Sequence, residues 1–241
     1  MKPLSTALAI VMTVVGFTFA HAAEGKKAAA PKAKAPNPVF APVTDVAGLP
    51  RVLLIGDSIS MGYTVPVRAQ LAGKANVHRP LENCGDTARG VKSLDKWLGT
   101  GKWDVIHFNF GLHDLKYLDA AGQLAPPDKG KQVASVAEYE ANLRTIVARL
   151  KQTGAKLIFA TTTPVPAGTT GRVADDSVRY NAVAVRVMRE LGVALNDLHA
   201  FVLPRQAQTQ RPANVHFTDP GSAQLAETVV SRIAVLLPRQ K

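Results

Sequence analysis

Residues 51–60 read Arg-Val-Leu-Leu-Ile-Gly-Asp-Ser-Ile-Ser, and this stretch decides the fold. The run that ends at Ile55 has the length and apolar character of a buried strand. A Gly-Asp-Ser turn follows at once and hands over to a helix that we expect to start near Gly62. A strand that passes through a tight turn into a helix is the repeating unit of a parallel α/β sheet. We therefore expect Ser58 to be exposed in the turn, close to helix amides.

Four further strand-length runs follow this unit, at residues 76–78, 104–110, 156–163 and 193–197. Stretches with helical spacing of apolar residues lie between them and after the last, at 136–150, 178–191 and 225–236. Parallel strands need connections of helix length. The pattern predicts an α/β fold, a three-layer doubly wound (flavodoxin-like) sheet of about five parallel strands with helices on both faces. In such sheets, ligands bind beyond the carboxyl ends of the strands.

Chemistry-bearing residues occupy four loops at these expected strand ends and before the last helix. The first loop holds Ser58, and the second reads Asn-Cys-Gly-Asp around Gly85, where the missing side chain lets a backbone amide approach a ligand. The third, residues 109–114, holds His113, and the last, Asn-Val-His-Phe, holds His216. A hydroxyl beside an imidazole and paired amides is what acyl transfer requires, because serine is a weak nucleophile until a base removes its proton.

With these four loops, the sequence resembles the GDSL, or SGNH, hydrolase family over residues 50–237. The blocks of that family place Ser, Gly, Asn and His at these loop positions in this order. The resemblance implies that Ser58 is the nucleophile and His216 the base. It also implies an oxyanion hole made of the Ser58 amide, the Gly85 amide and the side chain at position 113. The implied function is hydrolysis of short-chain acyl esters, above all acetyl esters on carbohydrate, through a Ser58 acyl-enzyme.

The sequence departs from the family at two positions. Position 113 is His instead of Asn, and His113 also presents an N–H donor in the right tautomer. Ala213 stands three residues before His216, where the family usually has Asp. A main-chain carbonyl or Asn214 then remains to accept from the imidazole, which gives a dyad instead of a triad. We expect Asp219 to cap the last helix, with Pro220 in its first turn.

Two alternative functions come from different classes. The hydroxyl-rich stretch from Ser58 to Gly62 loosely imitates a phosphate loop, as in a phosphate- or flavin-binding flavodoxin-like protein. The departures at 113 and 213 suggest a non-catalytic glycan-binding relative of the family. A common α/β-hydrolase elbow is disfavoured, because it needs Gly where Ser60 stands.

Several of these residues also have structural interpretations. A Ser after a strand is usually a helix cap, and His113 beside Asp114 is often a structural histidine. Asp57 and Asp114 are expected to bond turns, and Cys84 to pack as a small apolar residue. No His-x-x-x-His pair or carboxylate cluster has the spacing of metal ligands, so we expect no metal and no cofactor.

The amino-terminal segment predicts export. Residues 1–22 combine an early Lys, an apolar run and an Ala-His-Ala cleavage triplet, which is the pattern of a signal peptide. Residues 23–49 are rich in Lys, Ala and Pro and are predicted to be a flexible linker, followed by the hydrolase-like domain at 50–241. We expect a periplasmic or extracellular protein with no membrane span after cleavage.

The amino-acid composition limits the kinds of site and the classes of partner that the protein can have. The 241 residues are 46% hydrophobic and 20% charged, which is typical of a globular domain, and the single Cys excludes an intramolecular disulfide or a site of several thiolates. The 29 basic against 18 acidic residues give a net charge of +11, which favours anionic partners such as acidic polysaccharide. Export and the lack of an aromatic-basic recognition pattern argue against nucleic acid. The expected partner is a small-molecule or polysaccharide ester, and the sequence does not determine the oligomeric state.

Overall fold

The computed structural model describes residues 37–238. The predicted signal peptide and the first part of the predicted linker, residues 23–36, lie outside the described residues. The elements follow one another in this order: η1 Pro38–Phe40, β1 Arg51–Ile55, α1 Ser58–Gln70, β2 Asn76–His78, α2 Thr87–Leu98, β3 Val105–Phe108, β4 Tyr117–Leu118, β5 Lys131–Gln132, α3 Val136–Lys151, β6 Lys156–Ala160, α4 Asp176–Glu190, β7 Ala194–Asn196, α5 Leu198–Val202, η2 Leu203–Arg205, α6 Gln206–Thr209 and α7 Asp219–Leu236.

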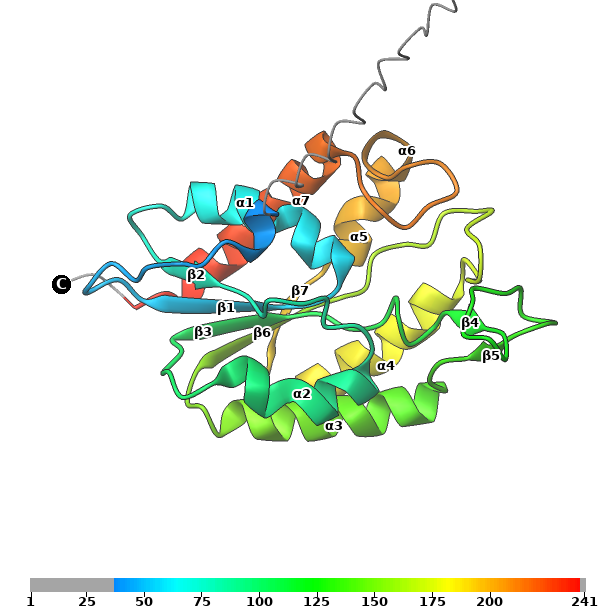
Figure 1. Cartoon of the computed structure of the whole chain (residues 1–241), viewed down its shortest axis with the longest axis horizontal. Helices are drawn as coiled ribbons and strands as arrows, with labels where there is room; N and C mark the ends of the chain where they lie inside the picture. The colour runs from blue at the N-terminus through cyan, green and yellow to red at the C-terminus, as the bar shows by residue number, and fades with distance from the viewer. Residues whose placement is uncertain (1–36, 239–241) are drawn as a thin grey trace, which may run out of the picture. The chain divides into compact units, whose positions relative to one another are not determined.

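A parallel five-stranded sheet in the order β2-β1-β3-β6-β7 forms the centre of the domain (Figure 1). Every neighbouring pair is parallel, and β1 lies against β3 with Val52 opposite Val105 and Ile55 opposite Phe108. The predicted three-layer doubly wound fold is confirmed. In this order the chain reverses direction across the sheet between β1 and β3. The topological switch point therefore lies there, where the loops after β1 and β3 come together.

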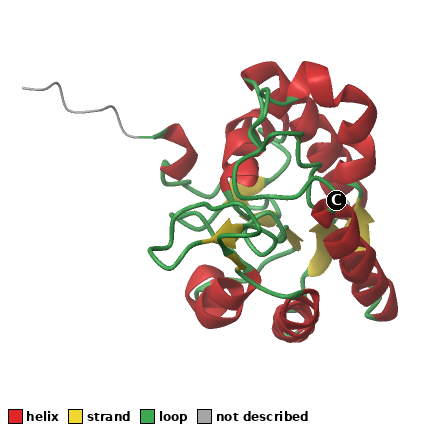
Figure 2. Cartoon of the chain, turned by 90° about the vertical axis from the view of Figure 1, so that its right-hand side faces the viewer, coloured by secondary structure: helices red, strands yellow, loops and turns green. Residues whose placement is uncertain are grey.

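Helices cover both faces of the sheet. Helices α1 and α7 pack together on one face, and α2, α3 and α4 pack side by side on the other. Figure 2, seen from the side, shows strands between two groups of helices. The strands are buried on both faces, and the largest side chains in the core are aromatic or branched aliphatic: Tyr63, Tyr139, Tyr180, Phe108, Phe110, Phe159, Leu53, Leu54, Ile55, Leu71, Ile106 and Leu112. This two-sided burial is why the strands read as apolar runs without alternation.

Three local expectations were wrong or incomplete. The sequence pattern predicts no strand between residues 110 and 136, but β4 and β5 form a short antiparallel pair there. Its residues give no periodic signal because each strand has two residues. Helix α1 begins at Ser58, four residues before the expected start, since Asp57 caps it. The expected strands 104–110, 156–163 and 193–197 are shorter in the structure, at Val105–Phe108, Lys156–Ala160 and Ala194–Asn196.

The end of the predicted linker, residues 37–49, contacts the domain. The guanidinium of Arg68 donates to the carbonyls of Pro38 and Val39, each at 3.1 Å. The backbone N–H of Val46 donates to Asn76 Oδ1 at 2.9 Å. These contacts tie residues 38–46 to Arg68 of α1 and Asn76 of β2. Over residues 37–238, no helix combines the length and apolar character that crossing a membrane requires.

Candidate active site

The turn after β1 presents Ser58 as the first residue of a helix. The carboxylate of Asp57 caps α1 by accepting from the Ile59 N–H at 2.9 Å. The Ser58 amide lies in the first helical turn, where backbone N–H groups have no intrahelical acceptor and the helix dipole is positive. Ser60 is buried, and its hydroxyl donates to the Asp57 carbonyl at 3.0 Å. Of the two serines in the stretch that imitates a phosphate loop, Ser58 lines the cavity and Ser60 does not.

Arg79, a buried arginine, joins the turn after β1 to the loop after β2. Arg79 is 6% exposed, and its guanidinium donates to the Gly56 carbonyl at 3.3 Å and to the Glu82 carbonyl at 3.2 Å. It also donates to the hydroxyls of Ser60 and Thr64, at 3.2 and 2.9 Å. Sequence reasoning missed Arg79, because a single basic residue after a strand carries no motif. Its bonds to Gly56, Ser60 and Thr64 span 15 to 23 positions along the chain.

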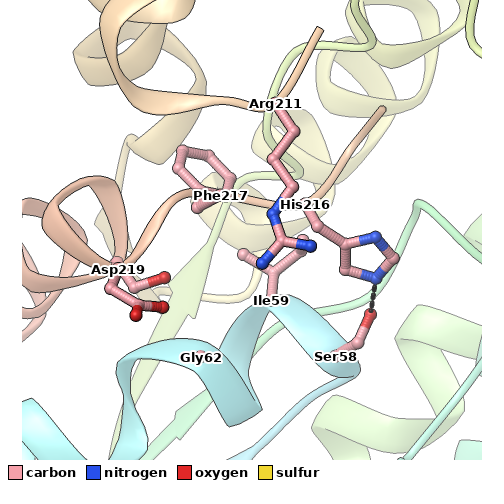
Figure 3. Close-up of a pocket in the computed structure, with 8 residues that line it drawn as sticks. Ser58, Ile59, Gly62, Arg211, His216, Phe217 and Asp219 are labelled. Atoms are coloured by element: carbon pink, nitrogen blue, oxygen red, sulfur yellow. Dashed lines mark hydrogen bonds between the residues drawn. The ribbon is translucent and has the colours of Figure 1, made fainter. Parts of the chain in front are cut away.

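The predicted nucleophile and base lie in contact. Ser58 Oγ and His216 Nε2 are 2.9 Å apart, although 158 residues separate them (Figure 3). Asn214 Oδ1 accepts from the His216 backbone N–H at 2.9 Å and lies 2.7 Å from His216 Nδ1. Since the backbone donor fixes the carboxamide oxygen toward the ring, Nδ1 must carry the imidazole proton. Nε2 is then left with a lone pair that can accept the Ser58 proton.

The loop that carries His216 is tied down by polar contacts on both sides of it. The Gln210 side-chain amide donates to the carbonyls of Pro164 and Val215, both at 3.0 Å. The next helix, α7, is capped by Thr218, whose Oγ1 accepts from the Gly221 N–H at 3.1 Å. The prediction that Asp219 caps this helix is wrong, because Asp219 is already the first helical residue. Pro220 does lie in the first turn, as expected.

The pKa of His216 is lowered from its ordinary value, chiefly because the ring is partly desolvated. The positive charges of Arg172 and Arg211 lower it further, and the negative charge of Asp57 opposes them. The imidazole is consequently neutral at pH 7, which is the state that a general base needs.

The loop after β2 lies beside the nucleophile turn. The Cys84 N–H donates to the Gly56 carbonyl at 3.2 Å, which joins the two loops. Gly85 has a φ of +67°, a conformation that favours glycine, and its amide donates to Asn83 Oδ1 at 2.9 Å. The predicted oxyanion donor at Gly85 therefore already has a partner that a substrate oxygen must share or displace.

His113 lies in the loop after β3, with a cation on one side of its ring. Lys116 Nζ is 3.3 Å from His113 Nδ1. Burial lowers the pKa of His113, and the charges of Lys116 and Arg172 add to the effect, against Asp57. An ammonium group only donates, so Nδ1 of the neutral ring is the acceptor and Nε2 carries the proton. His113 thus holds an N–H donor of the kind that the family's Asn supplies.

The cavity beside Ser58 has a volume of about 360 Å³. Its lining is partly apolar and partly charged: Ser58, Ile59, Gly62, Arg211, His216, Phe217, Asp219 and Ser222. Arg211 is the residue here that sequence reasoning missed, since nothing in its local sequence distinguishes it from other surface arginines. Within the described range 37–238, no three or more His, Cys, Asp or Glu side chains are grouped to hold a metal ion.

The other residues that the sequence singled out, Asp57, Asp114 and Cys84, have structural roles. Asp57 caps α1, and the buried carboxylate of Asp114 accepts from the Thr87 backbone and hydroxyl, with burial raising its pKa to about 7. Cys84 is fully buried, and desolvation raises the pKa of its thiol to about 11, so it packs as expected.

Comparison with solved structures finds the same fold in other proteins. A lipase/acylhydrolase from Enterococcus faecalis superposes with a TM-score of 0.66 at 22% identity, covering 80% of this chain and 99% of that one. The acetylxylan esterase Axe2 from Geobacillus stearothermophilus gives 0.62 at 19% identity, covering 76% and 94%. The acetyl xylan esterase AlAXEase gives 0.62 at 15% identity, covering 76% and 99%. At these identities, the likeness establishes the fold.

The sequence itself identifies the family. A search of curated protein sequences finds no significant match. The family model described as "GDSL-like Lipase/Acylhydrolase family" matches residues 54–224, most of the chain and all four predicted loops. This chain therefore belongs to the GDSL-like lipase/acylhydrolase family and is a carboxylic ester hydrolase.

Proposed function

We propose that this protein is an exported serine esterase that removes short acyl groups, above all acetyl, from carbohydrate. The observation that carries the proposal is the 2.9 Å contact between Ser58 Oγ and His216 Nε2 at the edge of an open cavity. The carbohydrate part is supported by the likeness to two acetyl xylan esterases, and export by the signal-like pattern of residues 1–22.

In the first half of the reaction, Ser58 Oγ attacks the ester carbonyl carbon while its proton passes to His216 Nε2. Asn214 Oδ1 accepts from Nδ1 and stabilises the imidazolium that forms. The negative charge that develops on the carbonyl oxygen is met by the Ser58 and Gly85 amides and by His113 Nε2–H. Collapse of this intermediate expels the alcohol, which takes the proton from Nε2, and leaves an acyl group on Ser58.

In the second half, water attacks the acyl carbon and gives its proton to His216. The tetrahedral intermediate then releases the carboxylic acid, and Ser58 Oγ recovers the proton from Nε2. The two halves use the same donors and the same base, so no additional group is needed.

The surroundings of Ser58 favour a short acyl chain. The cavity has a modest volume, and Ile59 and Phe217 supply its apolar wall. The long connection 118–135 is rich in Pro, Gly, Asp and Lys and carries only the β4–β5 pair, so among residues 37–238 it offers no apolar lid for a long chain.

The experiment is active-site labelling combined with a substrate panel. A serine-reactive fluorophosphonate should label Ser58, and S58A should lose both the label and the hydrolysis of 4-nitrophenyl acetate while its unfolding temperature stays the same. S222A, which removes a different hydroxyl from the cavity, is the matched control and should keep the label. Persistent activity in S58A, or a higher kcat/KM for octanoate than for acetate, would overturn the proposal.

A further inference from the structure

Arg79 is a buried cation that is paired with no carboxylate in the described part of the chain. It is 6% exposed, and among residues 37–238 no acidic side chain lies within 4 Å of its guanidinium. The Phe40 ring lies over it, with the guanidinium carbon 5.7 Å from the ring centre. Burying a charge is costly unless its hydrogen bonds are satisfied. The hydrogen bonds that offset this cost therefore indicate what the residue does.

The guanidinium of Arg79 makes five hydrogen bonds, which equals the number of its N–H groups. The acceptors are three backbone carbonyls and two hydroxyls: Gly56, Pro80 and Glu82 at 3.3, 3.1 and 3.2 Å, and Ser60 and Thr64 at 3.2 and 2.9 Å. Because a guanidinium presents its donors in one rigid plane, these bonds fix the acceptors relative to one another. The side chain thus joins the turn after β1 and the start of α1 to the loop after β2.

The two joined segments carry the backbone donors of the proposed oxyanion hole. Gly56 lies two residues before Ser58, and Glu82 lies three residues before Gly85. The Cys84 N–H also donates to the Gly56 carbonyl, at 3.2 Å, so this carbonyl accepts from both the arginine and the loop after β2. A shift of the guanidinium would therefore change the separation between the Ser58 and Gly85 amides.

We propose that Arg79 is a positioning residue for the oxyanion hole, which holds the Ser58 and Gly85 amides at the separation that the tetrahedral intermediate needs. Donors stabilise an oxyanion best when they are already in place as the charge develops. Misplacement by about 1 Å can lower kcat about 10²-fold, even when the changed residue is remote from the substrate. Arg79 does not line the cavity beside Ser58, so it acts through the two amides. This inference rests on the proposed function and concerns its rate.

The test replaces the planar group of Arg79 and keeps its charge. R79K should lower kcat for 4-nitrophenyl acetate about tenfold with little change in KM, because an ammonium has three donors and cannot hold five acceptors. The rate of fluorophosphonate labelling should fall by the same factor, since phosphonylation of Ser58 needs the same donors. The final labelled fraction should equal that of the wild type. Expressing kcat per labelled site removes the contribution of any unfolded protein.

R68K is the matched control. The Arg68 guanidinium also donates to backbone carbonyls, those of Pro38, Val39 and Val77, each at 3.1 Å. None of these three carbonyls belongs to a loop that carries a proposed oxyanion donor. R68K should therefore lower the unfolding temperature and leave kcat per labelled site unchanged.

F40A tests the same role with the arginine in place. Water would then compete for the N–H groups that the ring covers, and kcat should fall about threefold at unchanged KM. A wild-type kcat per labelled site in R79K, or in F40A where R79K does not fold, would overturn the positioning role. Equal losses of kcat in R68K and R79K would also overturn it, because they would assign the effect to stability. A wild type that neither labels nor hydrolyses the ester would instead overturn the proposed function.

Discussion

The two histidine loops of the site hold their rings in opposite tautomers. In the loop 210–218, an acceptor faces His216, because Asn214 Oδ1 lies against Nδ1 and leaves Nε2 free to take a proton. In the loop 109–116, a donor faces His113, because Lys116 Nζ lies against Nδ1 and leaves the proton on Nε2. The same side chain is thereby prepared as a base in one place and as a hydrogen-bond donor in the other. The difference lies in one neighbour on each ring, and both neighbours can be changed.

The largest effect is expected from removing the donor. H113A should lower kcat about 10²-fold with little change in KM, because the hydrogen bond strengthens only as charge develops on the oxyanion. H113N should recover much of the activity, since a carboxamide also supplies an N–H. Steady-state kinetics on 4-nitrophenyl acetate measures both. An H113A variant with unchanged kcat would show that the ring is structural.

A smaller effect is expected from removing the acceptor behind the base. N214A should lower kcat about tenfold, because His216 loses the partner that holds its proton on Nδ1 and its ring orientation. N214D should retain or exceed the wild-type kcat, since a carboxylate is also an acceptor and stabilises the imidazolium.

Position 213, where the family usually has Asp, provides a control for the comparison of N214A with N214D. A213D should change kcat little, because Nδ1 already has an acceptor in Asn214. Ala213 has a φ of +49°, which Asp tolerates better than most residues. A large gain in A213D would mean that Asn214 does not orient the base.

The effect of Lys116 should be smaller still. K116M should lower kcat only a few-fold, because an unpaired neutral imidazole interconverts between tautomers and presents its Nε2–H part of the time. The double variant H113N/K116M should lose no more than H113N alone, since an amide has no tautomer to set. Equal losses in both backgrounds would assign Lys116 a role apart from His113.

The pH profile gives the finest test of the comparison. His216 acts only when neutral, so kcat/KM should be full above its pKa and fall as the pH drops through it. Because desolvation lowers that pKa, with Arg172 and Arg211 adding to the effect against Asp57, the acid limb should lie below pH 6.5. In R211Q, the limb should move to higher pH. A limb above 6.5 in the wild type would contradict the desolvated environment.

The sequence by itself determined the sheet, its five strands, the loops that carry the chemistry and the family. Buried parallel strands must be apolar on both faces, and the loops at their carboxyl ends repeat in a fixed order, so both leave a signal in a linear pattern. The Ser58 and His216 positions belong to this part, because Ser58 begins helix α1 and His216 lies in the loop three residues before helix α7. The sequence pattern did not predict the short β4–β5 pair or the start of α1 at Ser58, because each depends on only a few residues.

Only the tertiary structure decided what surrounds those two residues. Which nitrogen of each imidazole carries the proton depends on Asn214 and Lys116, and the charged groups of the cavity are Arg211 and Asp219. The turn under Ser58 is held by Arg79 through bonds to residues up to 23 positions away. Hydrogen bonds and charges act over a few ångströms in space, whatever the separation along the chain. A polar residue in a surface loop therefore gains its role from the partners that folding brings to it.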